Sequence, residues 1–478
     1  ANCTSDITSI AVTSPGNLSN QVSASDYAKI NNLKLTGVIN DTDIAFIKQN
    51  LTAVKTLDLL DASFINNSIN TQFQKNTWVT LILPKGTLTI NSAALQESEW
   101  LQSIVLPEGL TDINSNAFYK CSSLQNIVLP STLRTIGIRA FNDCASLKAI
   151  TIPDRVESIE QYVFYECSAL EEIIIGNGVK SISGYGPFEG CNNLKKVVIG
   201  NGLTDLTGSI FQGKTNLTEV ILGENITTIG SSCFMGCTGL EKITLPKKLR
   251  NINGAAFLGC SNLRTIEMPD SLRILKDQVF QGCENLRSIT LPDSLESIGN
   301  QVFRDCKALK SITIPSKVTS LGQYVFYGCS ALESFILGDG IEEISTYDPF
   351  YECNNLRYVK LNDKLTYISN WFSNKSNLET VVLGNQVTTI GNSAFANCKS
   401  LQTINMPETL TTIGNSAFSG CSKLASIYIP ESVNKIENYA FSNSGLRTFT
   451  LPQNITIIPN YVFNNCDSLR TITLTPQL

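Results

Sequence analysis

Apolar residues recur along most of the chain in units of about 23 residues, as in the stretch 401–421. A typical unit reads L-x-x-I-x-L-P-x-x-L-x-x-I-x-x-x-A-F-x-x-C, and successive Phe residues are 22, 23 or 24 positions apart. A period in this range predicts supersecondary units that bury their apolar faces by stacking on their neighbours, and therefore one long solenoid. The Phe positions are Phe118, Phe141, Phe164, Phe188, Phe211, Phe234, Phe257, Phe280, Phe303, Phe326, Phe350, Phe372, Phe395, Phe418, Phe441 and Phe463.

The first part of each unit has the alternation of a half-buried strand. Ile404 and Met406 point to one face and Asn405 to the other. Pro407 then ends the strand, because it has no N–H to donate. Successive strands run in the same direction and predict a parallel sheet, while the rest of each unit returns as a turn plus a short helical or extended piece. One strand per unit gives about 19 short strands.

The chain has 15 Cys, and their positions argue against a disulfide framework. Thirteen of them lie three residues after a Phe, and Cys233 takes the slot before Phe234. Equivalent residues in stacked coils are roughly 5 Å apart with parallel Cα–Cβ bonds, which does not suit a disulfide. We therefore expect a column of buried, unbonded thiols, with Cys3 outside it.

Catalytic chemistry finds little support in the residues present. The chain has no His, which excludes the Ser-His-Asp and Cys-His nucleophile systems and the usual His ligands of zinc. Cys233 and Cys237 belong to repeat slots, so we expect no metal site there. The acidic pairs at 171–172 and 342–343 are adjacent in sequence, point to opposite faces of a strand or lie in turns, and are predicted to be solvated. We expect no catalytic, metal-binding or cofactor-binding residue.

Charge and hydropathy narrow the choice of partner. The chain has 36 basic and 41 acidic residues, a net charge of −5, and no basic run. This dispersal argues against nucleic acid or a bilayer as partner. No stretch approaches the roughly 20 apolar residues of a membrane span, and no leader opens the chain. The sequence fits a cytosolic protein or a mature form that has lost its leader.

The order L-x-x-I-x-L-P, L-x-x-I and A-F-x-x-C resembles the BspA-like leucine-rich repeat over roughly residues 54–478. The segment before it, with Ile30, Leu33, Leu35 and a helix-like stretch at 43–47, is similar to the N-terminal cap of bacterial members. We expect a capping region over 1–53 and a solenoid of 23-residue units over 54–478. The fold class expected is an α/β, β-rich leucine-rich-repeat solenoid, a right-handed superhelix with the form of a horseshoe or arc.

The resemblance implies a bacterial, extracellular or cell-surface protein that adheres to a host protein or another cell without catalysis. A glycan-binding or glycan-processing surface protein is a second hypothesis, and a structural spacer is a third. Cys3 near the start raises a lipid anchor as a further hypothesis, beside a packed residue of the cap. The chain stops near a strand at 469–474, so its parallel edge is open unless a tail or a second molecule covers it.

The middle residue of each predicted strand is expected on the open sheet face. These residues form a Thr/Val/Ile stripe between Val105 and Thr473, which β-propensity alone explains as well as a docking surface for a protein or glycan does. Aromatic and long charged side chains dominate interface energies when they cluster. The predicted contact residues are Lys242, Glu267, Arg357, Tyr358, Lys360 and Tyr428. Trp371 is compatible with either a core or an exposed position.

A longer repeat overlies the short one, because residues 162–246 are similar to residues 324–407. Both blocks carry an additional residue before the Phe, in Tyr185-Gly186-Pro187 and Tyr347-Asp348-Pro349. Each then has a Lys, Lys214 or Lys375, where Cys is usual. Block duplication explains the likeness. The irregularities are either functional loops or inherited insertions.

Overall fold

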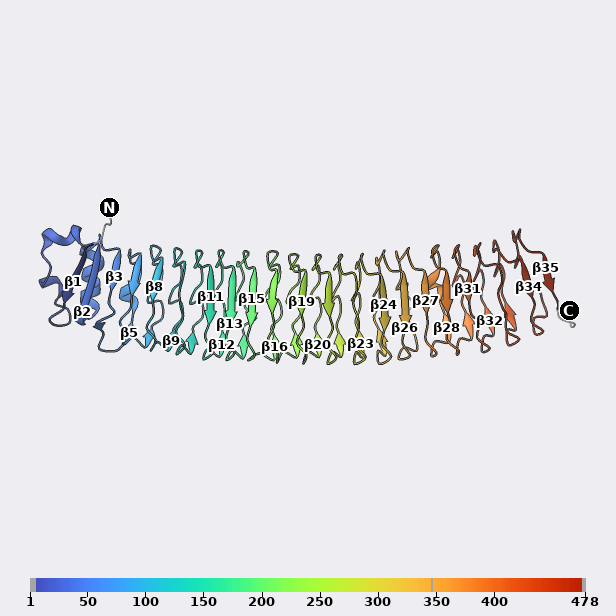
Figure 1. Cartoon of the computed structure of the whole chain (residues 1–478), viewed down its shortest axis with the longest axis horizontal. Helices are drawn as coiled ribbons and strands as arrows, with labels where there is room; N and C mark the ends of the chain where they lie inside the picture. The colour runs from blue at the N-terminus through green and yellow to red at the C-terminus, as the bar shows by residue number, and fades with distance from the viewer. Residues whose placement is uncertain (1–5, 345–346, 475–478) are drawn as a thin grey trace. The chain divides into compact units, whose positions relative to one another are not determined.

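The computed structural model describes residues 6–344 and 347–474. The chain divides into two compact units, with the division between Ile229 and Gly230. Within each unit, short parallel strands of successive coils lie side by side, and each coil repeats the path of the one before it (Figure 1). The prediction of a parallel, repeat-based β-solenoid is confirmed.

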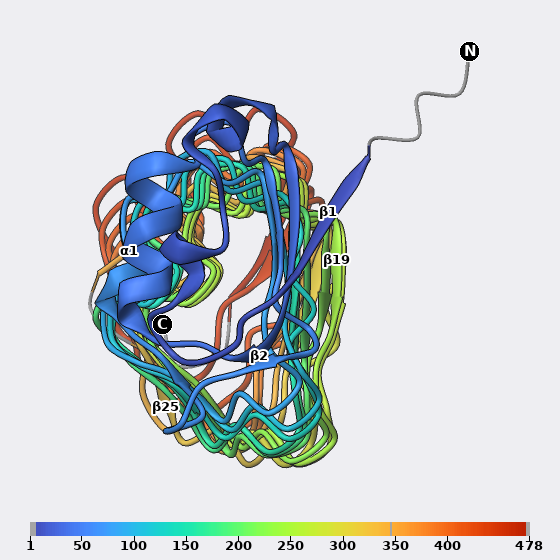
Figure 2. The same ribbon diagram turned by 90° about the vertical axis from the view of Figure 1, so that its left-hand side faces the viewer.

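The N-terminal segment contains β1 (Ile7–Ala11), β2 (Asn32–Val38), α1 (Asp41–Asn50) and β4 (Ala62–Ser63). The strands β1, β2 and β3 (Thr56–Asp58) pair in parallel and continue into the sheet of the first coils. Asn40 caps α1, because its side chain accepts the N–H groups of Thr42 and Asp43. The helix α1, labelled in Figure 2, contacts the short helix η3 (Thr71–Phe73), where Lys48 Nζ donates to Gln72 O at 2.9 Å. The cap over 1–53 stays a prediction.

Most coils have the predicted strand, and these strands form the sheet face, our name for the sheet built from them in each unit. In three coils, at residues 124–130, 286–292 and 424–430, the predicted strand is absent. In the first unit the strands are β3 (Thr56–Asp58), β6 (Thr80–Ile82), β8 (Ser103–Val105), β11 (Ala149–Ile152), β13 (Glu172–Ile175), β15 (Lys196–Ile199) and β17 (Glu219–Ile221). In the second they are β19 (Lys242–Thr244), β21 (Thr265–Glu267), β24 (Ser311–Ile314), β26 (Ser334–Leu337), β27 (Tyr358–Lys360), β29 (Thr380–Val382), β31 (Thr403–Ile404), β34 (Thr448–Thr450) and β35 (Thr471–Thr473).

Each unit also contains a second row of parallel strands, each two residues long, which the prediction of one strand per coil did not include. It forms where the second half of the repeat reads L-x-x-I. The first unit contains β5 (Ser68–Ile69), β7 (Thr89–Ile90), β9 (Asp112–Ile113), β10 (Thr135–Ile136), β12 (Ser158–Ile159), β14 (Ser181–Ile182), β16 (Asp205–Leu206) and β18 (Thr228–Ile229). The second contains β20 (Asn251–Ile252), β22 (Ile274–Leu275), β23 (Ser297–Ile298), β25 (Ser320–Leu321), β28 (Tyr367–Ile368), β30 (Thr389–Ile390), β32 (Thr412–Ile413) and β33 (Lys435–Ile436).

The segment around each Phe is a series of turns, and within the described ranges α1 is the only α-helix. Short 3-10 helices occur at η1 (Leu18–Asn20), η2 (Ala24–Lys29), η3 (Thr71–Phe73) and η4 (Asn370–Phe372). Asn116 and Lys120, two residues on either side of Phe118, both have φ of 58°. Their N–H groups each donate at 2.9 Å to carbonyls of the next coil. These bonds form a third hydrogen-bonded ladder. The residue two positions after the Phe has a positive φ, which Gly adopts without steric cost, and many coils have Gly there.

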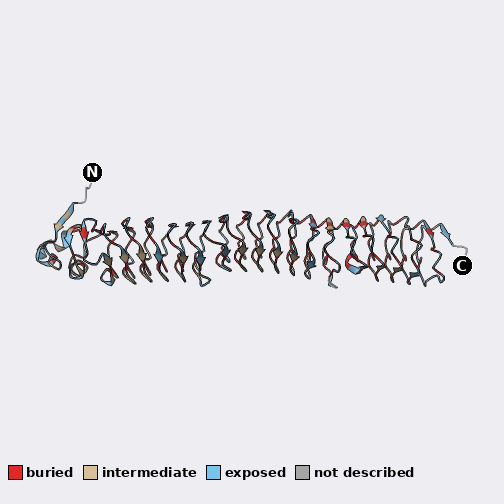
Figure 3. Ribbon diagram, turned by 90° about the horizontal axis from the view of Figure 1, so that it is seen from below, coloured by how far each residue is buried: buried red, intermediate tan, exposed pale blue. Residues whose placement is uncertain are grey.

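The Phe side chains form a buried column inside each unit, and buried residues recur in every coil (Figure 3). Neighbouring rings are nearly parallel, with centroids 5.1 Å apart for Phe118–Phe141 and 5.8 Å for Phe280–Phe303. Trp371 is also buried, at 3% exposure, which places it in the core. The apolar surface that a single coil would expose is therefore covered by its neighbours.

The cysteines of the repeat form no disulfide and are buried, except that Cys466 in the last described coil is half-buried. This confirms the predicted unbonded column, while Cys3 lies outside the described residues. The thiols are more than small apolar groups, because most of them donate to the carbonyl of a Phe one coil earlier, and Cys121 donates to Leu95 O. Cys144 Sγ is 3.2 Å from Phe118 O, and Cys283 Sγ is 3.3 Å from Phe257 O. A Cys at this slot thus fills space and satisfies an interior acceptor.

We expect these interior thiols to resist modification in the folded protein. Burial raises the pKa of Cys121, Cys191, Cys353 and Cys398 to about 12, so the reactive thiolate is scarce at neutral pH. Counting thiols with Ellman's reagent should show slow reaction of the column in buffer and complete reaction in denaturant. Among the described cysteines, Cys466 should react first, and Cys466→Ser should remove that phase. Rapid native labelling of Cys191 or Cys353, located by peptide mass mapping, would contradict this.

The last described coil leaves apolar side chains uncovered. Ile472 and Leu474 are 43% and 53% exposed, and β35 pairs only with β34 within the described residues. A hollow of about 230 Å³ lies here, lined by Phe449, Phe463 and neighbouring aliphatic residues. The predicted open edge is therefore present up to residue 474. What covers it stays a prediction.

Candidate binding face

Alternate residues of the sheet-face strands point to solvent and to the core. In β24 the exposure pattern is exposed, buried, exposed, buried, as the apolar alternation predicts. Parallel pairing in register then sets equivalent side chains next to one another. In the first unit this gives the apolar column, our name for Thr151, Ile174, Val198 and Ile221 on β11, β13, β15 and β17.

Charged side chains run beside the apolar column in neighbouring rows. Lys196 Nζ lies 3.8 Å from Glu172 Oε1 and 3.7 Å from Glu219 Oε1 in the adjoining coils. Lys195 Nζ and Glu171 Oε2 are 3.1 Å apart in the row next to it. Exposed ion pairs contribute only about 0–1 kcal/mol to stability. These rows therefore form a polar border to the column. Glu171 and Glu172 are solvated, as predicted, and each also pairs with a lysine.

Three of the six predicted contact residues lie together in the second unit. Lys360 is exposed on β27, between Ile336 of β26 and Val382 of β29. Tyr358, on the same strand, is half-buried, and Arg357 is exposed, with Nη1 3.6 Å from Glu379 Oε1. An ammonium, a guanidinium and a phenol thus occupy neighbouring positions of one coil. Their role in binding stays a prediction.

Of the other three predicted residues, Lys242 and Glu267 are on the same face in other coils, and Tyr428 is in a coil without a sheet-face strand. Lys242 pairs with Thr265, and Glu267 with Thr244, so both charges lie on the adjacent strands β19 and β21. Tyr428 is 61% exposed and donates to Glu408 Oε1 at 3.1 Å, a bond that raises the pKa of the phenol. The structure therefore gives one cluster of three residues, one pair of residues and one separate aromatic. Their role also stays a prediction.

Sequence reasoning missed aromatic side chains outside the sheet face. Trp100 is 59% exposed, and Lys55 Nζ lies 5.3 Å from the centroid of its ring. On the turn side, Tyr327 and Tyr351 stack at 4.9 Å, and the guanidinium of Arg304 is 4.6 Å from the ring of Tyr327. The Tyr residues next to a core Phe were visible in sequence, but their outward direction depends on the left-handed turns.

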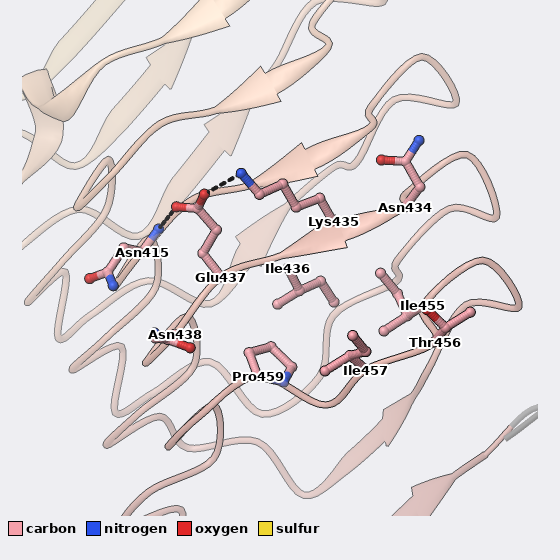
Figure 4. Close-up of a pocket in the computed structure, with 10 residues that line it drawn as sticks. All are labelled: Asn415, Asn434, Lys435, Ile436, Glu437, Asn438, Ile455, Thr456, Ile457 and Pro459. Atoms are coloured by element: carbon pink, nitrogen blue, oxygen red, sulfur yellow. Dashed lines mark hydrogen bonds and ion pairs between the residues drawn. The ribbon is translucent and has the colours of Figure 1, made fainter.

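A polar hollow of the second unit lies next to β33 (Figure 4). Its volume is about 530 Å³, and it is bounded by residues 434–438 on one side and by residues 455–459 on the other. Glu437 Oε1 is 2.6 Å from Lys435 Nζ, and its other oxygen accepts the N–H of Asn415 at 3.0 Å. The bond from Lys435 is the main reason that the pKa of Glu437 is lowered.

Pro459 explains why this hollow exists. At the equivalent position of the two preceding coils, Gly414 N donates to Ile390 O at 2.8 Å and Glu437 N donates to Ile413 O at 3.0 Å. Pro459 has no N–H, so Ile436 O cannot receive the corresponding bond. Within the described ranges, no backbone hydrogen bond joins residues 455–458 to β33, and the coil separates from its neighbour.

The described residues contain no group of His, Cys, Asp or Glu side chains suited to hold a metal ion. Glu342 and Glu343 are exposed, and Glu342 Oε1 is 3.4 Å from Lys364 Nζ. Among the described helices, none has the length and apolar character needed to traverse a bilayer.

The stacked coils with one sheet-face strand each define a leucine-rich-repeat solenoid. A family model of the BspA type leucine rich repeat region matches residues 67–187, 170–287, 275–402 and 369–478. The chain belongs to the BspA-type leucine-rich repeat family.

The chain is similar to solved structures of bacterial leucine-rich repeat proteins. One, from Bacteroides ovatus, is 29% identical with a TM-score of 0.56, over 83% of this chain and 92% of that one. A leucine rich cell surface protein from Faecalibacterium prausnitzii is 25% identical with a TM-score of 0.30, over 72% and 83% of the two chains. No curated protein matches. The Bacteroides ovatus structure supports the fold over most of the chain.

Proposed function

We propose that this protein is a non-catalytic binding protein of the bacterial cell surface or extracellular space, which adheres to a protein through its sheet face. Membership of the BspA-type family supports the binding role. The observation that carries the proposal is the apolar column with its border of ion pairs. A patch that is apolar at its centre and polar at its rim has the anatomy of a protein interface.

The column is suited to reversible contact rather than to burial within the chain. Ile221 is 48% exposed, and farther along the face Val105 and Val128 are 50% and 81% exposed. The partner's apolar side chains would remove this surface from water, at about 25 cal/mol per Å². The cluster of Arg357, Tyr358 and Lys360 offers a second anchor of the type that dominates interface energies.

Single substitutions at the column should reduce adhesion without unfolding the solenoid. Val198→Lys sets a charge in the middle of the column, and we expect at least a tenfold loss of affinity, since a desolvated charge at an interface centre costs more than about 1.4 kcal/mol. Ser181→Lys, on an exposed position of the second sheet, is the matched control. Binding to an array of purified extracellular host proteins, followed by titration of each hit, gives the measurement. Equal affinity of both variants would exclude the column.

The two other hypotheses predict different outcomes in the same set of assays. A glycan-processing protein would release products from a glycan panel, and removing Glu171 and Glu172 would abolish them. A spacer would bind neither proteins nor glycans as an isolated array. Surface accessibility of the protein to antibody on intact bacteria tests the proposed location.

A further inference from the structure

Two coils have a lysine inside the thiol column. Lys214 and Lys375 replace the usual Cys, and each is only 5% exposed. Burying an ammonium group is costly unless a partner of opposite charge accompanies it. The two sites come from equivalent positions of the duplicated blocks, so the chain offers an internal comparison of how each lysine is compensated.

Lys375 has a carboxylate of the same unit beside it. Its Nζ lies 4.0 Å from Asp348 Oδ2, and that side chain is about one-third exposed, at 34%. Burial raises the pKa of Asp348, and the charge of Lys375 acts in the opposite direction. Asp348 also accepts the N–H of Phe350 at 2.8 Å. The second block therefore compensates its buried lysine with its own aspartate.

Lys214 has no such carboxylate, because Gly186 stands where the other block has Asp348. Among the described residues, no ion pair or side-chain hydrogen bond involves its ammonium group. Instead, Lys214 lines a cavity of about 410 Å³ together with Gly186, Pro187, Ser209 and Gln212. The space that Asp348 occupies in one block thus corresponds to an open cavity in the other.

We propose that this cavity binds a carboxylate group supplied from outside the chain, with Lys214 as its counter-ion. The second block shows the chemistry that suits a lysine at this slot, because there the partner is a carboxylate. The volume lies within the range of about 300–1,000 Å³ typical of small-ligand sites. The side chains of Ser209 and Gln212 line the same cavity and make no side-chain hydrogen bond within the described part of the chain, so both are available as donors.

The acidic neighbours limit which ligands fit. Glu189 lines the cavity without forming an ion pair to Lys214, and Glu166 lies on the adjoining turn, close to Gly190. A second or third negative charge on the ligand would meet these carboxylates. We therefore assign the site to monocarboxylates, either small free acids or the tip of an acidic side chain. The site is separate from the sheet face and does not depend on the proposed function.

Titration with [13C]acetate, observed by NMR at constant ionic strength with chloride as the balancing anion, tests the site. We expect one saturable site in the unaltered protein, half-saturated at roughly 1–10 mM, an affinity that a single buried charge pair can supply. Lys214→Cys restores the usual residue of the repeat and should abolish saturation. Asp348→Gly makes the second block like the first and should create a second acetate site. Asp348→Gly combined with Lys375→Cys should remove that second site again.

The two sources of the carboxylate are separated by a second probe, N-acetylglutamate α-amide. Competition between this compound and acetate would point to an acidic side chain, whereas acetate binding alone would point to small free acids. Acetate signals that do not change in Lys214→Cys would overturn the proposal. So would binding that appears only in Glu189→Gln, because Glu189 would then be the natural partner of Lys214. Equal competition by chloride would remove the assignment to carboxylates.

Discussion

Replacing Phe280 by Ala is expected to lower the free energy of unfolding by about 3–5 kcal/mol. Phe280 is fully buried in the second unit, with its ring 5.7 Å from that of Phe257 and 5.8 Å from that of Phe303. Removing it leaves a void between two coils that backbone ladders hold at a set spacing, so the walls cannot collapse to fill it. Chemical denaturation followed by circular dichroism gives the measurement.

Phe463→Ala is the matched control for that experiment, because it makes the same chemical change at the last Phe of the column. Phe463 is half-buried and stacks on Phe441 at 6.1 Å. Less of its surface is removed from water, so we expect less than about half the loss found at Phe280. Equal losses at the two positions would show that stacking between coils does not carry the stability of the unit.

Replacing Gly299 by Pro is expected to destabilise the second unit by about 3 kcal/mol or more. Gly299 N donates to Leu275 O at 2.8 Å, at the repeat position that Pro459 occupies in a later coil. The substitution removes this bond and leaves an interior carbonyl without its donor. Gly299→Ala is the control. It adds a Cβ, which would lie 2.5 Å from Asp277 Oδ1, as Pro also does, but it keeps the N–H. The difference between the two variants isolates the loss of the N–H together with the ring.

The reverse substitution, Pro459→Gly, tests the same explanation in the other direction. It restores an N–H facing Ile436 O, so residues 455–458 should pair with β33 and the hollow of Figure 4 should narrow. Hydrogen exchange at Thr456 and Ile457 should become slower, while exchange in β20 and β22 should be unchanged. Unchanged exchange at both positions would mean that another residue holds this coil away.

Much of the fold was predictable because the coils repeat. Identical side chains such as Phe257 and Phe280 come together whenever one unit stacks on the next, so a pattern in sequence becomes a column in space. The same argument led to the unbonded thiols and to the exposed middle residues of the sheet face. The second row of strands and the left-handed turns at Asn116 and Lys120 were not predicted, because both depend on backbone hydrogen bonds to a neighbouring coil.

The features of the candidate sites were also predictable only in part. The exposure of Lys360 followed from alternation along a strand, which is a local property of the sequence. Tyr428 is exposed as the same pattern predicts, although its coil has no strand. That Arg357, Tyr358 and Lys360 form one cluster, distant in sequence from Lys242, was also visible in the residue numbers. The stack of Tyr327 on Tyr351 was not, because it joins residues of adjacent coils across a turn whose direction the sequence pattern leaves open.

By itself, the sequence determined the period, the residues of the interior columns and the family, because these follow from apolar positions that recur at a constant spacing. Only the tertiary structure decided where the regular stack is interrupted. Pro459 opens a hollow because its missing N–H faces Ile436 O, and Lys214 borders a cavity because Gly186 provides no carboxylate. Both features depend on contacts between coils, because Ile436 O lies opposite a residue without an N–H and Lys214 lies near a residue without a carboxylate.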